Sequence, residues 1–271
     1  MRYRRGMAVP GRYARVNDIE MYYEVHGEGS PLVLLHGGLL SIDLNFAGML
    51  PALAERHQVI AVELQGHGHT PDSDRELTID NLADDVAALL GHLGVDRASF
   101  FGFSLGGLVS IAVADRHPQL VDRLVLASVH YRHDGYLDGI REGGSDADIA
   151  ARMPTQADFA EMHAAYLAVA PDPDHFEKIM AKASGMIDAF GGWSDETMAA
   201  ITAPTLIVLG DLDFVRIEHA SRMRDLMPNG RLAVLPGTTH AQVTGRTDWL
   251  LPMVRDFLAP SVTPATAGRG R

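Results

Sequence analysis

The chain has 271 residues, of which 46% are hydrophobic and 21% are charged, enough apolar material for one large globular domain or two small ones. Its formal net charge of −12 argues against nucleic acid and anionic membrane surfaces as partners, and the lack of cysteine excludes disulfides, thiolate chemistry and zinc–sulfur sites. No apolar run has the length of a membrane span and the N-terminus lacks a signal-peptide core, so we expect a cytoplasmic protein that uses no membrane.

The first predicted element is an antiparallel hairpin with strands at 13–16 and 19–25, turned by Asn17 and Asp18. From about residue 31 onward, short apolar runs alternate with amphipathic helical runs, which is typical of a mainly parallel α/β sheet. Six further strands are predicted at 32–35, 59–62, 98–101, 124–127, 205–209 and 232–235. Helices are predicted at 46–55, 79–93, 105–117, 216–227 and 247–258, the second of them capped by Thr78.

One interval breaks this alternation, because far more chain separates Ala127 from Thr205 than a single crossover helix requires. The excess contains helical patterns at 146–152, 156–169 and 174–183. Thr155 with Asp158 predicts a cap for the second, and Asp172 before Pro173 predicts one for the third. We therefore expect an α/β core over 12–128 and 204–259, an inserted helical lid and crossover over 129–203, and flexible tails at 1–11 and 260–271.

The motif Gly102-Phe103-Ser104-Leu105-Gly106 stands between a predicted strand and a predicted helix. This is the context in which a G-x-S-x-G serine becomes a nucleophile on a sharp turn. A serine held in a strained conformation needs neighbours without bulky side chains, and Gly102 and Gly106 supply that clearance. The serine also lies at a helix N-terminus, where free backbone N–H groups favour developing negative charge.

A serine hydroxyl needs a base at neutral pH, and the base needs an orienting acid. Two later strands each lead into a loop that carries such a group. The strand at 205–209 is followed by Gly210-Asp211-Leu212-Asp213, and the strand at 232–235 by a loop that ends in His240. The carboxyl ends of parallel strands meet at one edge of the sheet, so we expect Ser104, an aspartate and His240 to meet there.

Together these motifs resemble the α/β-hydrolase fold superfamily over about residues 12 to 259. The elements that carry the resemblance are the loop His36-Gly37-Gly38, the loop 63–70, the G-x-S-x-G turn, the G-x-x-D acid loop and a late histidine, all in family order. The resemblance implies a mainly parallel, doubly wound sheet of about eight strands with an inserted helical lid. It also implies a hydrolase that needs no cofactor and takes a small-molecule substrate.

The resemblance also implies a role for each site residue. Ser104 is expected to attack the substrate carbonyl, His240 to carry the proton and Asp213 to orient the imidazole. The family pattern favours Asp213 over Asp211 as the acid, and Ser128 occupies the position where some relatives carry it instead. The oxyanion is expected to bind the backbone N–H groups of Leu105 and Gly38, with Leu39 as the alternative to Gly38.

The substrate pocket is predicted to include Leu39, Phe103, Tyr131, Tyr166 and Met186. Of the 13 histidines, His67 and His69 form an H-x-H pair, but Pro71 stands where a binuclear metal motif needs aspartate, and no H-E-x-x-H occurs. We therefore predict no metal site, no cofactor site and no nucleotide-binding motif. His36 is predicted to organise its loop by hydrogen bonds, and His130 and His133 to face either the pocket or solvent.

The leading functional hypothesis is a serine hydrolase that cleaves a carboxylic ester or a lactone through an acyl-enzyme on Ser104. Cofactor-free perhydrolases of the haloperoxidase type and carbon–carbon bond hydrolases use the same three residues, and the sequence leaves these alternatives open. A hypothesis of another class is a ligand sensor that keeps the hydrolase fold but turns over little substrate. The sequence leaves the oligomeric state open.

Overall fold

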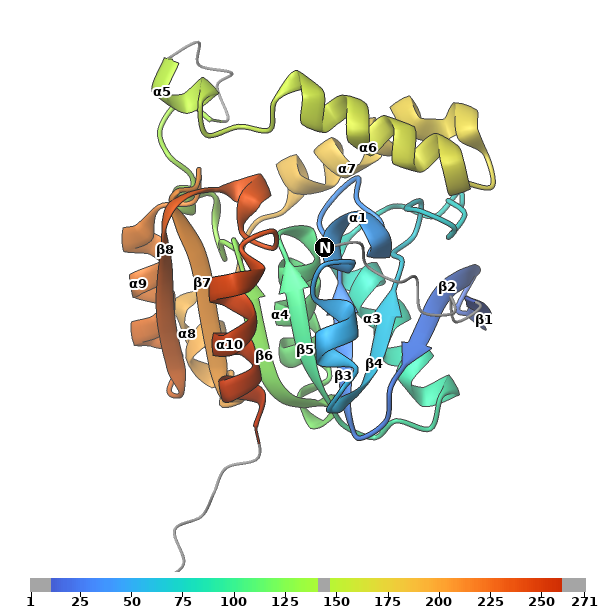
Figure 1. The fold of residues 1–271 in the computed structure, drawn as a ribbon, viewed down its shortest axis with the longest axis horizontal. Coiled ribbons are helices and arrows are strands. Elements are labelled where there is room, and N and C mark those ends of the chain that lie inside the picture. The colour runs from blue at the N-terminus through green and yellow to red at the C-terminus, as the bar shows by residue number, and fades with distance from the viewer. Residues whose placement is uncertain (1–10, 141–146, 260–271) are drawn as a thin grey trace, which may run out of the picture.

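The computed structural model describes residues 11–140 and 147–259, and a mainly parallel sheet lies at its centre (Figure 1). Within these residues the sheet has eight strands in the spatial order β1-β2-β4-β3-β5-β6-β7-β8. The hairpin of β1 and β2 and the pairing of β2 with β4 are antiparallel, and the other neighbouring strands are parallel. The predicted fold class is confirmed. The strands are β1 (Arg12–Val16), β2 (Ile19–His26), β3 (Ser30–Leu35), β4 (His57–Val62), β5 (Ala98–Phe103), β6 (Val121–Ala127), β7 (Thr205–Leu212) and β8 (Gly230–Thr239).

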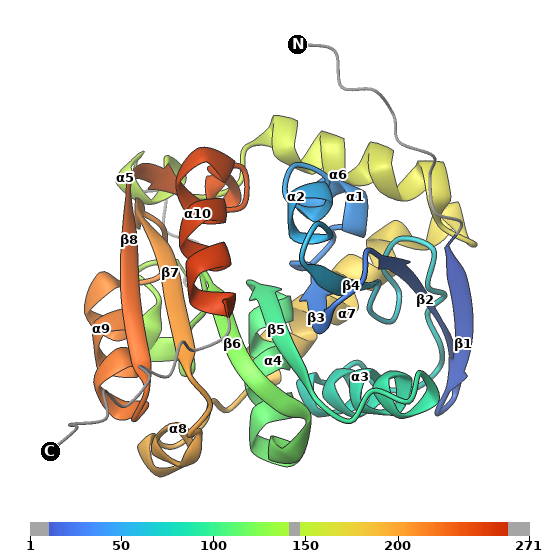
Figure 2. The ribbon, with the colours of Figure 1, turned by 60° about the horizontal axis from the view of Figure 1, so that its bottom comes forward.

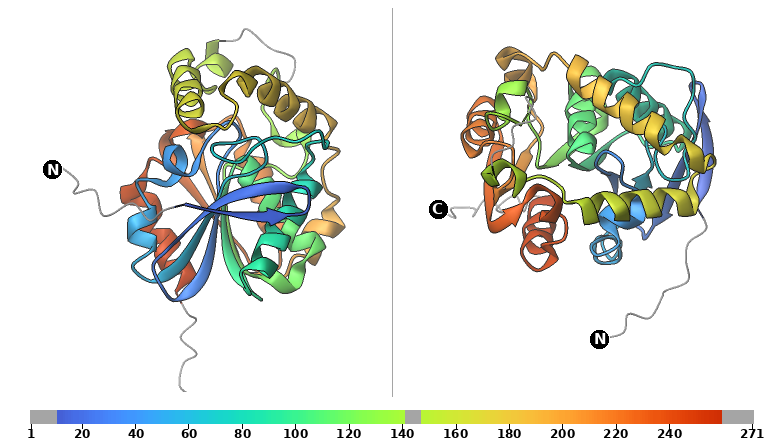
Figure 3. Two further views of the ribbon diagram at one scale, coloured as in Figure 1. Left: turned by 90° about the vertical axis from the view of Figure 1, so that its right-hand side faces the viewer. Right: turned by 90° about the horizontal axis from the view of Figure 1, so that it is seen from above.

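Helices cover both faces of the sheet, because successive strand residues point to opposite faces and both sets are apolar. In β3, Val33 and Leu35 belong to one buried cluster while Leu32 and Leu34 belong to the other. Figures 2 and 3 show the two helical layers on either side of the strands. The first cluster includes α3 (Ile79–His92), α4 (Leu105–Arg116) and α9 (Ile217–Leu226), and the second includes α1 (Ile42–Phe46), α2 (Leu50–Leu53) and α10 (Thr247–Leu258).

The long segment between β6 and β7 contributes α5 (Ala147–Ala150), α6 (Gln156–Val169), α7 (Phe176–Ala189) and α8 (Asp195–Ala200). Seen from above, α6 and α7 lie across the upper edge of the sheet (Figure 3). This is the edge at which the parallel strands end. Thr155 and Asp158 form the predicted capping box at the start of α6.

The predicted start of the third lid helix is wrong. The side chain of Asp172 caps no helix, and Pro173–His175 forms a separate turn of 3-10 helix before α7 begins at Phe176. The end was also placed too early, because α7 continues to Ala189 and buries Met186. Residue 146, the first of the predicted helix 146–152, lies outside the described residues. The predicted tails at 1–11 and 260–271 also lie outside them, apart from Gly11.

The single helix predicted at 46–55 is also wrong, since two short helices occupy this stretch. α1 begins at Ile42, earlier than predicted, because the Ser41 side chain caps it by accepting a hydrogen bond from Leu44 N. This helix ends at Phe46. α2 begins at Leu50 with Pro51 in its first turn. Proline has no N–H to donate to the preceding turn, so one continuous helix through this segment would lose a hydrogen bond. The structure breaks the helix there instead.

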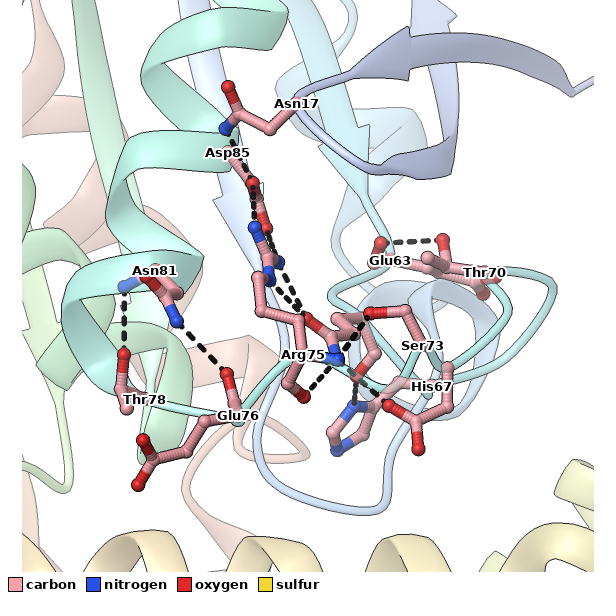
Figure 4. Close-up of polar contacts among 12 residues, drawn as sticks. Asn17, Glu63, His67, Thr70, Ser73, Arg75, Glu76, Thr78, Asn81 and Asp85 are labelled. Carbon is pink, nitrogen blue, oxygen red and sulfur yellow. Dashed lines mark hydrogen bonds and ion pairs between the residues drawn. The ribbon is translucent and has the colours of Figure 1, made fainter.

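The loop 63–78 connects the sheet to α3 through buried polar contacts (Figure 4). Arg75 forms an ion pair with Asp85 of α3 and also donates to Gln65. Asn17 of the hairpin turn donates to the same carboxylate at 2.7 Å. The side chain of Gln65 in turn donates to Asp72 at 2.8 Å.

Asp72 joins this loop to the segment above the sheet. Its carboxylate accepts two hydrogen bonds of 2.8 Å from Lys182 of α7 and contacts His175 Nε2 at 2.8 Å. The side chain of Asp72 is only 4% exposed. Burial opposes its charge, but hydrogen bonds from Lys182, Gln65 and His175 outweigh burial and lower the pKa of Asp72 to about 2.

Replacing Asp72 with asparagine is expected to lower the free energy of unfolding at pH 7 by about 2–3 kcal/mol, because Lys182 then loses its partner in a largely buried site. A carboxyl whose pKa is lowered on folding stabilises the folded state above its unfolded pKa of about 4. This stabilisation is lost as the pH falls from about 4 towards 2, so the difference between wild type and variant should shrink over that range. Urea unfolding at several pH values measures it.

The control is Asp74→Asn, which removes an exposed carboxylate from the same loop and should change stability by less than about 0.5 kcal/mol. Equal stability of Asp72→Asn and wild type at pH 7 would contradict the role of this ion pair.

Among the described residues, no helix is both long and apolar enough to cross a bilayer.

Candidate active site

Ser104 lies on a strained turn between β5 and α4. Its φ of 50° and ψ of −114° place it in a region that side-chain-bearing residues rarely adopt. The turn is possible because a Cβ at Gly102 would overlap the carbonyl oxygen of Gly106, and a Cβ at Gly106 would overlap that of Leu35. The backbone N–H of Ser104 donates to Ala127 O at 2.9 Å, which fixes the turn against the end of β6.

The acid and histidine follow the ends of the neighbouring strands β7 and β8. The predicted strand ends at residues 209 and 235 are wrong, since pairing continues through a bulge to the pair Leu212 and Thr239. Asp211 supports this extension by accepting a hydrogen bond from Thr238 N at 3.2 Å. Asp213 and His240 are the next residues on two paired strands, and the register therefore sets them side by side.

The structure brings Ser104, His240 and Asp213 into one hydrogen-bonded chain. His240 Nδ1 lies 2.9 Å from Asp213 Oδ1, and His240 Nε2 lies 3.1 Å from Ser104 Oγ. Since a carboxylate only accepts, Nδ1 carries the proton and Nε2 presents a lone pair to the serine hydroxyl. Asp213 and His240 are both buried. This is the geometry of a hydroxyl activated by an oriented base.

Asp213 is held as a carboxylate by several donors. Ser128 Oγ donates to Oδ2 at 2.6 Å and Val215 N donates to Oδ1 at 3.0 Å, in addition to the contact with His240. Burial alone would raise the pKa of Asp213, but the electrostatic interaction with the His240 imidazole and these hydrogen bonds lower it. Arg152 fixes the same loop by donating to Asp213 O at 3.1 Å.

The loop after β3 lies beside Ser104, since Gly38 lines the same two cavities as Ser104. His36 is buried, its Nε2 accepts from Leu64 N at 3.1 Å and its Nδ1 therefore donates to Gly37 O at 2.8 Å. Burial lowers the pKa of His36 to about 3, so the ring is neutral and organises the loop as predicted. Gly37 N donates to Asn45 Oδ1 at 2.9 Å, and Leu39 takes a left-handed φ of 61°.

Two cavities meet at Ser104, and Gly38, Phe214 and His240 line both. The α6-side cavity has a volume of about 310 Å³, and α6 contributes Phe159 and Met162 to its wall. The α7-side cavity has a volume of about 110 Å³, and α7 contributes Ala183, Met186 and Ile187. Leu105, named for the oxyanion, lines the α7-side cavity, and as the first residue of α4 its N–H has no carbonyl one turn earlier.

Three of the five predicted pocket residues line these cavities, namely Leu39 and Phe103 on the α6 side and Met186 on the α7 side. Tyr131 and Tyr166 line neither, which corrects the prediction. The buried ring of Tyr131 stacks on His219, and its hydroxyl donates to Asp195 at 2.7 Å. Tyr166 packs against Phe176, within the helical segment itself.

Two residues beside the hydroxyl–imidazole pair, Phe214 and Ser128, were not predicted to contact it. Phe214 stacks on the His240 ring with centroids 4.0 Å apart, and only its place beside Asp213 hints at this. Ser128, noted only as an unused acid position, donates to Asp213. His130, predicted to face either the pocket or solvent, is buried on the wall of the α7-side cavity. Within residues 11–140 and 147–259, no three His, Asp or Glu side chains are grouped to hold a metal ion.

A family model described as alpha/beta hydrolase fold matches residues 30–145. A putative carbamate hydrolase, RutD, from Agrobacterium fabrum is 26% identical over 265 residues, covering 89% of this chain and 99% of that protein. The dihydrolipoyllysine-residue acetyltransferase component of the acetoin cleaving system of Pseudomonas putida is 43% identical over 107 residues. This match covers 39% of this chain and 28% of that protein, so the chain spans well under two thirds of it.

Among solved structures, the enol-lactonase from Burkholderia xenovorans LB400 has a TM-score of 0.72 and 26% identity, covering 91% of this chain and 99% of the lactonase. The shared fold and the family model agree with the order of motifs seen in the sequence. The chain has the fold of the α/β-hydrolase superfamily, and its residues 30–145 match the model of that family.

Proposed function

We propose that the protein is a cofactor-independent serine hydrolase that cleaves a carboxylic ester or a lactone through an acyl-enzyme on Ser104. The observation that carries this proposal is the chain of contacts from Asp213 through His240 to Ser104 Oγ, with distances of 2.9 and 3.1 Å. The similarity to an enol-lactonase supports the substrate class, since a lactone is a cyclic ester.

In the first half-reaction, Ser104 Oγ attacks the carbonyl carbon and its proton passes to His240 Nε2. The tetrahedral intermediate collapses with cleavage of the carbon–oxygen bond, and the leaving oxygen takes the proton from His240. Water then attacks the acyl-enzyme, again giving a proton to His240, and the carboxylic acid leaves as Ser104 regains its hydrogen. Asp213 stays ionised throughout and stabilises the charged imidazole.

Charge develops on the carbonyl oxygen during both steps, and backbone donors offset it. The N–H of Leu105 opens α4, where the helix dipole also favours negative charge. The second donor in this proposal is the N–H of Gly38, a residue of the loop after β3 that lines both cavities together with Ser104. Each such donor typically contributes about 3–4 kcal/mol to stabilising the transition state.

Steady release of p-nitrophenol from p-nitrophenyl acetate by the wild type tests this proposal, with Ser104→Ala as the control. We expect many turnovers per chain in the wild type and a fall to near background in the variant. A single slow release per chain would favour a ligand sensor over an enzyme. A panel of p-nitrophenyl esters of rising acyl length, with several lactones and a bulky aryl ester, then identifies the preferred substrate.

A further inference from the structure

A groove beside α7 adjoins the α7-side cavity. This α3–α7 groove has a volume of about 580 Å³, and the residues around the start of α3 and those of α7 line it. Leu77, Ile79 and Phe190 are among its apolar lining residues, and Lys182, which pairs with Asp72, is among the charged ones. None of the three catalytic residues of the proposed mechanism lines this groove, so the mechanism does not account for it.

Two faces of α7 meet at Met186. One face lines the α3–α7 groove through Lys182, Gly185, Met186 and Ala189. Another face lines the α7-side cavity through Ala183, Met186 and Ile187. Within each set the residues are spaced by three or four positions, which places side chains on one side of a helix. Of the described residues, Met186 alone lines both spaces, so it lies at the boundary between them.

The wall between the groove and the cavity is thin. Because the same residue lines both spaces, the wall is one side chain thick at Met186. Met186 is only 6% exposed, so its side chain is packed into that wall. A second contact joins the two linings, since the ring of Phe190 from the groove meets the ring of His130 from the cavity edge-on, with centroids 6.3 Å apart.

We infer that Met186 closes the α7-side cavity against the α3–α7 groove and thereby sets the length of acyl chain that the enzyme accepts. This inference rests on the proposed function and deepens it by naming the substrate class, which is esters of short-chain acids. A volume of about 110 Å³ matches about four water-sized groups at about 30 Å³ each, so a short acyl chain fills the cavity. A longer chain meets Met186, and close-packed interiors resist such overpacking.

The acyl group belongs in the α7-side cavity because of the order in which the products leave. In a double displacement the alcohol departs first, while the acyl group stays on the serine. The α6-side cavity offers the exit, since Met153 and Phe159 in its wall are exposed to solvent. The smaller cavity, closed by Met186, holds the group that remains bound.

The experiment compares the hydrolysis of p-nitrophenyl decanoate with that of p-nitrophenyl butanoate. The ratio of their kcat/KM values, decanoate over butanoate, is measured for wild type and Met186→Ala. Comparing one ratio between variants cancels the intrinsic reactivity of each ester. We expect the wild type to prefer butanoate by at least about 10-fold, and Met186→Ala to raise the ratio about 10-fold or more, because the longer chain then passes into the groove.

Ile187→Ala is the matched control, because it removes as many side-chain atoms as Met186→Ala, but Ile187 lines the cavity and not the groove. This variant enlarges the cavity without opening it, so the ratio should rise far less. Met180→Ala removes an exposed methionine of α7 that lines neither space, and it should leave the ratio unchanged. Met186→Val, which removes fewer atoms, repeats the test if Met186→Ala does not unfold cooperatively.

An unchanged ratio in whichever Met186 variant unfolds cooperatively would overturn the inference. An equal rise in Ile187→Ala, or a wild type that hydrolyses the decanoate as well as the butanoate, would also overturn it. A limit on chain length that depends on Met186 only in a series of alkyl acetates would overturn the acyl assignment. Failure of the wild type to hydrolyse any of these esters or to react with a fluorophosphonate at Ser104 would instead count against the proposed function.

Discussion

Replacing His240 with alanine is expected to lower kcat for p-nitrophenyl ester hydrolysis by about 10⁵- to 10⁶-fold, because the Ser104 hydroxyl then loses the only base within hydrogen-bond reach among the described residues. Residual activity should come from the oxyanion donors and substrate binding alone. Initial rates under saturating substrate measure the effect. Adding Ser104→Ala to this variant should lower kcat little further, since residues of one catalytic unit are not additive.

The control for this prediction is His92→Ala, which removes an exposed histidine from the last turn of α3. That variant should keep the wild-type kcat. Retention of more than a tenth of the activity in His240→Ala would show that His240 is not the base.

Gly106→Ala is expected to lower the free energy of unfolding by at least about 3 kcal/mol and to disrupt the turn that holds Ser104. The added Cβ overlaps the carbonyl oxygen of Leu35 and also lies 2.7 Å from His36 O. Both obstacles are backbone atoms of β3 and its loop, so neither can turn aside as a flexible side chain would. Urea unfolding and the rate of fluorophosphonate labelling measure the two effects.

Gly185→Ala makes the matched comparison, because Gly185 lies inside α7 and a Cβ there meets no atom within 4 Å. Alanine in a helix interior should stabilise the protein by about 0.5–1 kcal/mol. If both glycine variants had the stability of the wild type, this would contradict the prediction that a Cβ at position 106 destabilises the protein by its close approach to β3.

The strands of the core could be predicted because each is an apolar run bounded by turn residues. The end of β8 could not, because Pro236 and Gly237 in sequence indicate a loop. In the fold, Asp211 bonds Thr238 N across the bulge and pairing continues to Thr239. Ser41 and Pro51 both indicate the break between α1 and α2. The helical pattern around them outweighed these signals and led to the prediction of one continuous helix.

Around Ser104, too, the sequence predicts some of the contacting residues and does not predict others. Motifs with fixed chemistry, such as the glycine-flanked serine, identified candidates that the fold brings into contact. The identity of an aromatic residue does not determine where its side chain points. The side chain of Tyr131 points to Asp195 and away from the cavities. The burial of His130 depends on contacts with segments distant in sequence, such as Phe190, which no local pattern encodes.

Mass spectrometry of the protein after reaction with a fluorophosphonate tests the role of Ser104 as the nucleophile most directly. We predict one adduct per chain, on the peptide that contains Ser104, and none on Ser104→Ala. An adduct that persists on Ser104→Ala at equal stoichiometry, or that lies on another residue of the wild type, would contradict the assignment of Ser104 as the nucleophile.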